Sequence, residues 1–190
     1  MIRLFAALTV PDAAAAALAP LRGGVPGARW SPGENLHITL RFFGDIDEAR
    51  AEDLEGELGR ISVEPFDVTL AGVGAFGAGR DVSAIWAGVE AGEALSRLAA
   101  RCETAARRSR LKADTRVWKP HVTLAYLRHA EPAEVAAWVQ TFNRLRTPSF
   151  PMARFGLYSS WRSDGGSVHH LERDYTFRRP PRGPSAPPAG

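Results

Sequence analysis

Two short segments of this chain carry a histidine and a threonine at the same spacing. Residues 37–40 read His-Ile-Thr-Leu, and residues 121–124 read His-Val-Thr-Leu. Polar residues alternate with β-branched or apolar ones in both, which is typical of a half-buried strand. Because successive side chains of a strand point to opposite faces, each segment would present its imidazole and its hydroxyl side by side on one face.

Two imidazoles on a common substrate suit general acid–base catalysis. The unperturbed pKa of histidine is near 6.5, so one of His37 and His121 can be neutral while the other is protonated. On a phosphodiester, one ring would take the proton of an attacking water and the other would protonate the departing ribose oxygen, each transfer contributing roughly 10²–10⁴-fold. Thr39 and Thr123 would donate hydrogen bonds to the non-bridging oxygens.

This scheme needs no metal or other cofactor, and we expect none. A zinc site built on the two histidines is disfavoured because no Asp, Glu or Cys stands at a ligand position within either segment.

The two segments lie 84 residues apart (121 − 37 = 84), and other landmarks recur at that offset. Phe66 aligns with Phe150, and Gly72 aligns with Gly156. The spacing indicates an internal duplication, and two similar halves commonly pack about an approximate two-fold axis. We therefore expect both His-Thr pairs to face one central cleft.

Hydrophobic periodicity and turn residues predict the elements that must hold the two segments. Helices are expected over 11–22, 47–60, 93–109 and 131–142, and further strands over 2–9, 65–73, 82–89, 150–159 and 167–177, with a turn at 44–47. The hairpins favour antiparallel pairing. The predicted class is α+β, with two similar lobes that each combine a mostly antiparallel sheet with flanking helices.

Composition bounds the remaining possibilities. The chain has 190 residues, a net charge of +3 and a single cysteine, so an intrachain disulfide is excluded and a polyanionic partner is allowed. No stretch reaches the roughly 20 apolar residues of a membrane span, so we expect a cytoplasmic protein, and nothing indicates a protein partner or more than a monomer. Residues 1–178 are expected to form one bilobal domain, and residues 179–190, rich in Pro and Gly, a disordered tail.

Cationic and aromatic residues flank the two segments. Arg41 falls on the predicted face of His37, and Lys119 on that of His121; both side chains suit phosphate. Trp30 or Trp118 could stack on a base. The three other histidines read as loop or strand-surface residues: His129, His169 and His170.

The sequence around both segments resembles the two-histidine (2H) phosphoesterase superfamily. The likeness rests on the two His-x-Thr motifs, the opening Ile-Arg-Leu-Phe-Ala-Ala-Leu, and the runs at 34–44 and 119–125, and it covers about residues 1–178. Within the superfamily, the chain is most similar to the RNA 2′,3′-cyclic phosphodiesterases, also called 2′-5′ RNA ligases.

This resemblance implies a bilobal fold whose central cleft is lined by both motifs. It implies metal-independent opening of a terminal 2′,3′-cyclic phosphate on RNA to a 2′-phosphate, and reversible 2′-5′ joining of RNA such as tRNA halves. His37 and His121 carry over as the acid–base pair, with His37 assigned as the acid and His121 as the base. Thr39 and Thr123 carry over as phosphate donors.

One position departs from the family pattern. Relatives often have an arginine five residues after the second histidine, where it holds phosphate, and this chain has Tyr126 there. A phenol donates one hydrogen bond but carries no charge. The charge would have to come from Arg41, Arg128 or Arg162, with Tyr126 itself a substrate contact.

Two other functions fit the same sequence. One is a non-catalytic RNA- or nucleotide-binding protein that keeps the cleft. The other is a phosphodiesterase for a different cyclic phosphate, such as ADP-ribose 1″,2″-cyclic phosphate, or for a 2′-5′ oligoadenylate.

Overall fold

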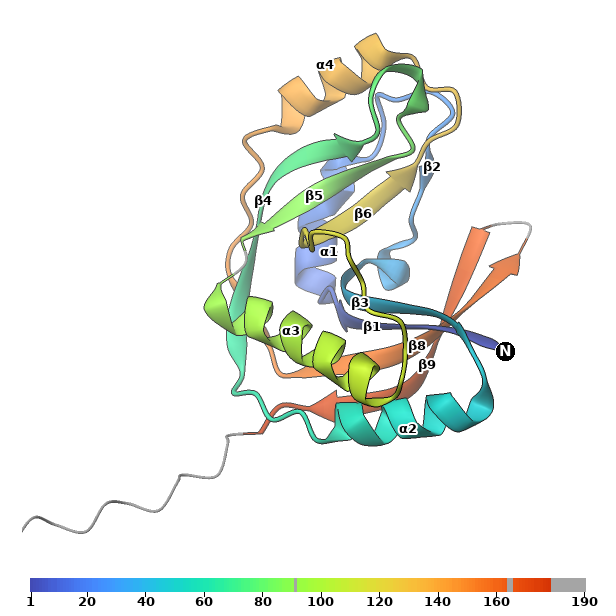
Figure 1. Cartoon of the computed structure of the whole chain (residues 1–190). Helices are drawn as coiled ribbons and strands as arrows, with labels where there is room; N and C mark the ends of the chain where they lie inside the picture. Colours follow the sequence, from blue (N-terminus) through green and yellow to red (C-terminus); the bar gives the residue numbers. More distant parts are fainter. Residues whose placement is uncertain (91, 164–165, 179–190) are drawn as a thin grey trace, which may run out of the picture.

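The computed structural model describes residues 1–90, 92–163 and 166–178, so the expected disordered tail lies outside the described residues. The strands of this part of the chain (Figure 1) are β1 (Ile2–Thr9), β2 (Arg29–Trp30), β3 (His37–Ile46), β4 (Phe66–Phe76), β5 (Ala84–Glu90), β6 (His121–Tyr126), β7 (Phe150–Met152), β8 (Arg154–Ser163) and β9 (Gly166–Thr176). Its helices are α1 (Asp12–Leu18), α2 (Glu48–Gly59), α3 (Glu93–Arg108) and α4 (Pro132–Phe142), with 3₁₀ turns η1 (Ala19–Leu21), η2 (Gly33–Asn35) and η3 (Gly79–Asp81).

The strands pair in the order β7-β4-β5-β6-β3-β1-β8-β9, and β2 adds to the outer end of β6. All of these pairings are antiparallel. The two strands that begin at the motif histidines, β3 and β6, are therefore neighbours at the centre. Three strands follow outward on each side, as a duplicated chain would give. The predicted α+β class with antiparallel pairing is confirmed.

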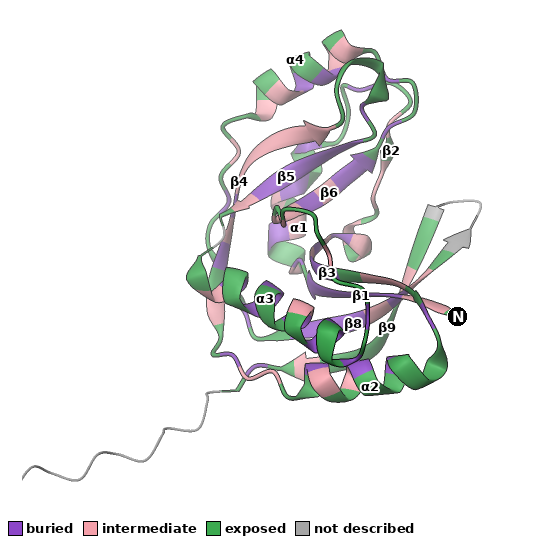
Figure 2. Ribbon diagram, viewed as in Figure 1, coloured by how far each residue is buried: buried purple, intermediate pink, exposed green. Residues whose placement is uncertain are grey.

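The helices cover the outside of this curled sheet. In Figure 1, α2 and α3 lie together beside β3 and β9, while α4 lies beside β4. The buried residues of α3 recur at three- and four-residue steps (Leu95, Leu98, Ala99, Cys102, Ala105 and Ala106), which gives the helix one apolar stripe toward the sheet. Figure 2 shows the same pattern as buried inner faces and exposed outer faces.

Tertiary pairing moved several boundaries. The expected turn at 44–47 is strand as far as Ile46, because β1 pairs with it from Ile2↔Ile46 onward. Gly44 adopts φ +82 there, which a glycine accepts without strain, and the Asp47 side chain then caps α2 by accepting a hydrogen bond from the Arg50 amide at 2.9 Å. The single strand expected over 150–159 is divided into β7 and β8, which pair with different strands.

Within the described residues, no helix is both long enough and apolar enough to cross a bilayer. The single cysteine, Cys102, is a free and fully buried thiol in the core under α3, and burial raises its pKa. It takes no part in the site described next.

Candidate active site

The two motifs meet at the centre of the sheet. Ile38 pairs directly with Val122, and both side chains are fully buried in the core. In an antiparallel pair the residue numbers of partners have a constant sum, here 160, so the same register sets His37 opposite Thr123. It likewise sets Thr39 opposite His121. The polar side chains of both motifs therefore share the face of the sheet that looks away from Ile38 and Val122.

Each motif histidine is fixed through the same ring nitrogen. Nδ1 of His37 lies 2.7 Å from the carbonyl oxygen of Asn35, and Nδ1 of His121 lies 2.7 Å from that of Lys119. Because a carbonyl oxygen only accepts, Nδ1 must carry the hydrogen in both rings. Nε2 is then the atom that gains or loses a proton, which is the arrangement required of an acid–base pair.

Aromatic side chains from other strands pack against each imidazole: Phe5 from β1 against His37, and Phe76 from β4 and Trp86 from β5 against His121. The ring centroids of Phe5 and His37 lie 5.1 Å apart. Those of Phe76 and His121 lie 4.7 Å apart in an edge-to-face arrangement, and Trp86 lies 6.3 Å from His121. These rings remove water from the histidines on one side and restrict their rotation.

The surroundings disfavour a charge on both rings. Desolvation is the main cause that lowers the pKa of His37 to about 4, and the nearby imidazoles of His169 and His121 lower it further. Desolvation also lowers the pKa of His121, with the Lys119 ammonium acting in the same direction. The hydrogen bonds to Asn35 and Lys119 oppose these shifts without cancelling them. Both rings are therefore neutral at pH 7 in the free protein.

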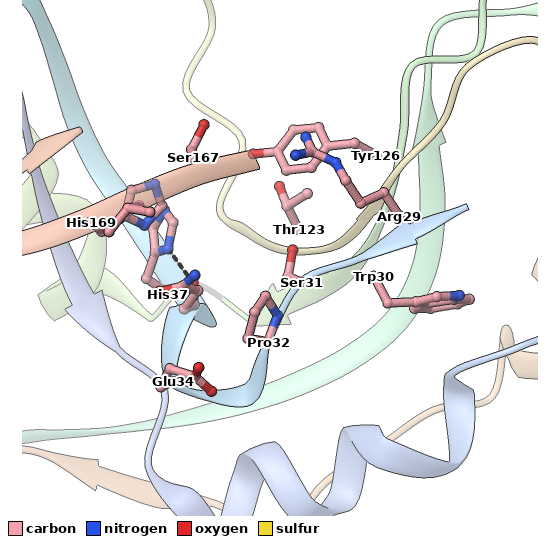
Figure 3. A pocket seen from close by; sticks show the side chains of 12 residues that line it. Arg29, Trp30, Ser31, Pro32, Glu34, His37, Thr123, Tyr126, Ser167 and His169 are labelled. Carbon is pink, nitrogen blue, oxygen red and sulfur yellow. Dashed lines mark hydrogen bonds between the residues drawn. The ribbon is translucent and has the colours of Figure 1, made fainter. Parts of the chain in front are cut away.

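A cleft of about 480 Å³ opens beside this pair (Figure 3). His37 and Thr123 line it together with the 29–35 segment, Tyr126 and residues 167–169 of β9. His121 and Thr39 do not line it. The cleft thus reaches His37 and Thr123, which lie opposite each other on β3 and β6. It extends from them between β2 and the β8–β9 hairpin.

Comparison with known proteins agrees with this geometry. A family model for the 2′-5′ RNA ligase superfamily matches residues 10–164. The chain belongs to the 2′-5′ RNA ligase superfamily. The resemblance drawn from the two His-x-Thr motifs is confirmed.

Relatives and solved structures match most of the chain. An RNA 2′,3′-cyclic phosphodiesterase of Archaeoglobus fulgidus is 29% identical over 171 residues, which is 88% of this chain and 96% of the relative. One of Aquifex aeolicus is 24% identical over 77% of this chain and 80% of its own length. A crystal structure of E. coli LigT complexed with 3′-AMP superposes with a TM-score of 0.74 at 25% identity, covering 94% of this chain and 99% of LigT. A protein of Thermus thermophilus gives a TM-score of 0.76 at 25% identity, with the same coverage of both chains.

Arg41 does not share a strand face with His37 and Thr39, so the expectation that it lies on the face of His37 is wrong. A β-bulge separates it from Thr39, because Thr39 pairs with Ala7 whereas Arg41 pairs with Ala6. The extra residue turns Arg41 toward α3, where 8% of it is exposed. Its guanidinium donates to the Glu103 carboxylate at 2.5 Å and to the Lys112 carbonyl at 2.7 Å, and lies 3.5 Å from Asp114.

Arg29 stands beside the tyrosine that departs from the superfamily pattern. It pairs with Tyr126 across β2 and β6, and its guanidinium carbon lies 5.3 Å from the centroid of the Tyr126 ring. Both residues line the cleft, as Figure 3 shows. Sequence reasoning missed Arg29 because a two-residue strand leaves no periodic signal. Arg128, one of the expected substitutes, is exposed and does not line the cleft, and the side chain of Arg162 lies outside the described residues.

The aromatic and cationic residues that flank the two motifs make different contacts. Trp118 donates its indole N–H to the carbonyl oxygen of Thr39 at 3.0 Å, which ties the segment before β6 to β3. Lys119 lies 4.2 Å above the Trp86 ring, on the His121 side. Trp30 lines the cleft and also packs on Trp138 at 6.3 Å.

The other three histidines were expected on the surface. His129 and His170 are exposed, as expected. His169 is half-buried and lines the cleft. Strand alternation gives the face of β9 on which His169 lies. Only the pairing of β8 with β1, which the sequence does not show, brings that face beside His37.

Proposed function

We propose that this chain hydrolyses a terminal 2′,3′-cyclic phosphate on RNA to a 2′-phosphate by metal-independent acid–base catalysis, and that it can also catalyse reversible 2′-5′ joining. The observation that carries this proposal is the Ile38↔Val122 register, which sets each motif histidine opposite the other motif's threonine. The names of the relatives support the substrate class. The family and fold support the reaction class.

The reaction needs one proton to be removed and one to be supplied. Nε2 of His121 takes a proton from water as the water oxygen bonds to phosphorus. The bond from phosphorus to the ribose 3′-oxygen breaks, and Nε2 of His37 supplies the proton to that oxygen, which leaves the phosphate on the 2′-oxygen. We assign His37 as the acid because the cleft, which is large enough for a nucleoside, lies on its side of the pair.

The lowered pKa of His37 has a consequence for this assignment. A ring that is neutral in the free protein can act as an acid only if it gains a proton when substrate arrives. The negative charge of a phosphodiester within a few ångströms favours the imidazolium and raises the pKa of His37. Substrate binding and protonation of His37 are therefore expected to be linked.

The phosphate is expected to be held by neutral donors and one nearby cation. Thr39 and Thr123 offer hydroxyl groups on the face of the two imidazoles, and Arg29 brings a guanidinium to the cleft wall beside Tyr126. Among the described residues, no three His, Cys, Asp or Glu side chains are grouped to hold a metal ion. The experiment below tests independence from metal directly.

The test is incubation of the full chain with a short RNA that ends in a 2′,3′-cyclic phosphate, with and without EDTA. We expect a 2′-phosphate product, identified by its ³¹P chemical shift, at the same rate in both samples, and a rate about 10²–10⁴-fold lower with His121→Asn. A 3′-phosphate product would overturn the regiochemistry, and loss of activity in EDTA would overturn the metal-free mechanism. RNA binding without turnover would favour the non-catalytic alternative.

A further inference from the structure

A third histidine contacts the proposed acid. The rings of His169, on β9, and His37, on β3, meet edge to face, with centroids 5.0 Å apart and planes 82° apart. Both rings also pack on Phe5, at 4.9 Å and 5.1 Å. Figure 3 shows His169 directly beside His37, and both line the cleft.

The ring cluster is held in place by the neighbouring strands. Phe5 also stacks on Tyr158 at 5.4 Å, and the Tyr158 hydroxyl lies 2.6 Å from Oγ1 of Thr9. Thr9 in turn pairs with His37 across β1 and β3. The contact between the two imidazoles is thus supported by side chains from four strands, β1, β3, β8 and β9.

Few charged groups of the described residues face this contact. The titratable groups around it are Glu34 from η2, Arg29 from β2, His121 and Tyr126 from β6, and Tyr158 from β8. Glu34 is exposed, so water screens its carboxylate. His169 is only half-buried, and desolvation alone lowers its pKa, whereas its charge lowers the pKa of the more deeply enclosed His37. A proton on His169 therefore disfavours a second proton on His37.

We propose that His169 is a positioning residue for His37: its ring holds the imidazole of His37 in place, and the charge that it gains in acid solution opposes protonation of that imidazole. The inference rests on the proposed function, in which His37 is the acid. It gives the β8–β9 hairpin a role in orienting the proposed proton donor. A charge 5.0 Å away in a partly hydrated site is expected to move a titration midpoint by roughly half a pH unit or more.

Two variants separate the charge of His169 from its packing. His169→Phe keeps a ring against His37 and removes the charge, while His169→Gln removes both. His170→Ala is the matched control, because His170 is the adjacent residue on β9, is exposed, and does not line the cleft. The readout is the NMR titration of the His37 ring in the full chain, assigned with His37→Asn, which requires no turnover.

We expect the His37 midpoint to rise by roughly half a unit or more in both His169 variants and to stay unchanged in His170→Ala. With the cyclic-phosphate RNA, the limb of the pH–rate profile that belongs to His37 should move in the same direction. An unchanged midpoint in His169→Phe would overturn the electrostatic role, even if His169→Gln had moved it through lost packing. Because the titration needs no catalysis, failure of the proposed function would appear only in the rate measurement.

Discussion

Ile38 and Val122 face each other across β3 and β6, and they are equivalent residues of the two repeated motifs. This one pairing brings together segments that lie 84 residues apart in the chain. Their side chains are buried, so the register is set by the core and not by the polar residues that use it. A slip of one residue would turn the His and Thr side chains into the core.

Removing either motif histidine should lower turnover sharply. We expect His37→Asn and His121→Asn each to lower kcat on the cyclic-phosphate RNA by about 10²–10⁴-fold, because each removes one proton transfer. His170→Ala should retain the wild-type rate. Far-UV circular dichroism must show native folding for the comparison to count. Activity within about threefold of wild type in either motif variant would contradict the assignment.

The threonines should affect the transition state more than folding. Thr39→Val and Thr123→Val keep the shape of the side chain and remove the hydroxyl. We expect each to lower kcat/KM by about 10- to 100-fold, the effect of one lost hydrogen bond to a charged phosphate oxygen. Steady-state kinetics provide the measurement, with the melting temperature as the control. A loss of stability with unchanged kinetics would show that the hydroxyls serve the fold.

Arg41 should matter for stability and not for substrate. Arg41→Met leaves the Glu103 and Asp114 carboxylates partly buried, although Arg107 and Arg116 still pair with them at 2.8 Å. We expect a loss of about 2–3 kcal/mol in the free energy of unfolding. This is less than for a buried ion pair whose remaining carboxylate has no other arginine beside it. Urea denaturation measures this loss. KM for the RNA should not change, and a large rise in KM would restore Arg41 as a phosphate ligand.

Arg29 should matter for substrate binding. Arg29→Gln keeps hydrogen-bonding groups at the cleft wall but removes the charge beside Tyr126. We expect KM to rise by about tenfold with kcat nearly unchanged, and the dependence of KM on salt concentration to weaken. Arg128→Gln is the matched control, since Arg128 is exposed and outside the cleft lining. Equal effects of the two substitutions would indicate a general charge effect.

His37 should cause the free energy of unfolding to decrease as pH is lowered through the mildly acidic range. Its pKa is about 4 in the folded protein and near 6.5 in the unfolded chain, so the unfolded chain binds the proton first. The contribution is fully present above pH 6.5 and is lost as pH falls toward 4, by about 3 kcal/mol for a shift of this size.

Urea denaturation at about pH 7.5 and about pH 4.5 tests this dependence, because most of the His37 contribution is lost between these two pH values. The lowered pKa values of His121 and His169 act in the same direction, so the comparison must be made against His37→Gln. That variant should lose less stability between the two pH values than wild type does. Equal losses would mean that His37 is not kept neutral by the fold.

The sequence by itself determined the two reactive pairs. A histidine and a threonine at i and i+2 share a face of any strand segment without a bulge, because the side-chain period of a strand is two. The repeat at 84 residues also predicted that the two strands are equivalent. Helices with a clear apolar stripe, such as α3, were predicted within a residue for the same reason: the pattern is local.

The tertiary structure decided which other residues join the pairs. Strand alternation in the sequence places Arg41 on the face of His37, but a bulge imposed by the pairing with β1 turns it to the opposite face. Arg29 reaches the cleft through a two-residue strand on β6, and His169 reaches His37 from the far edge of the sheet. These contacts depend on register and curvature between segments distant in sequence, which local patterns of polarity do not encode.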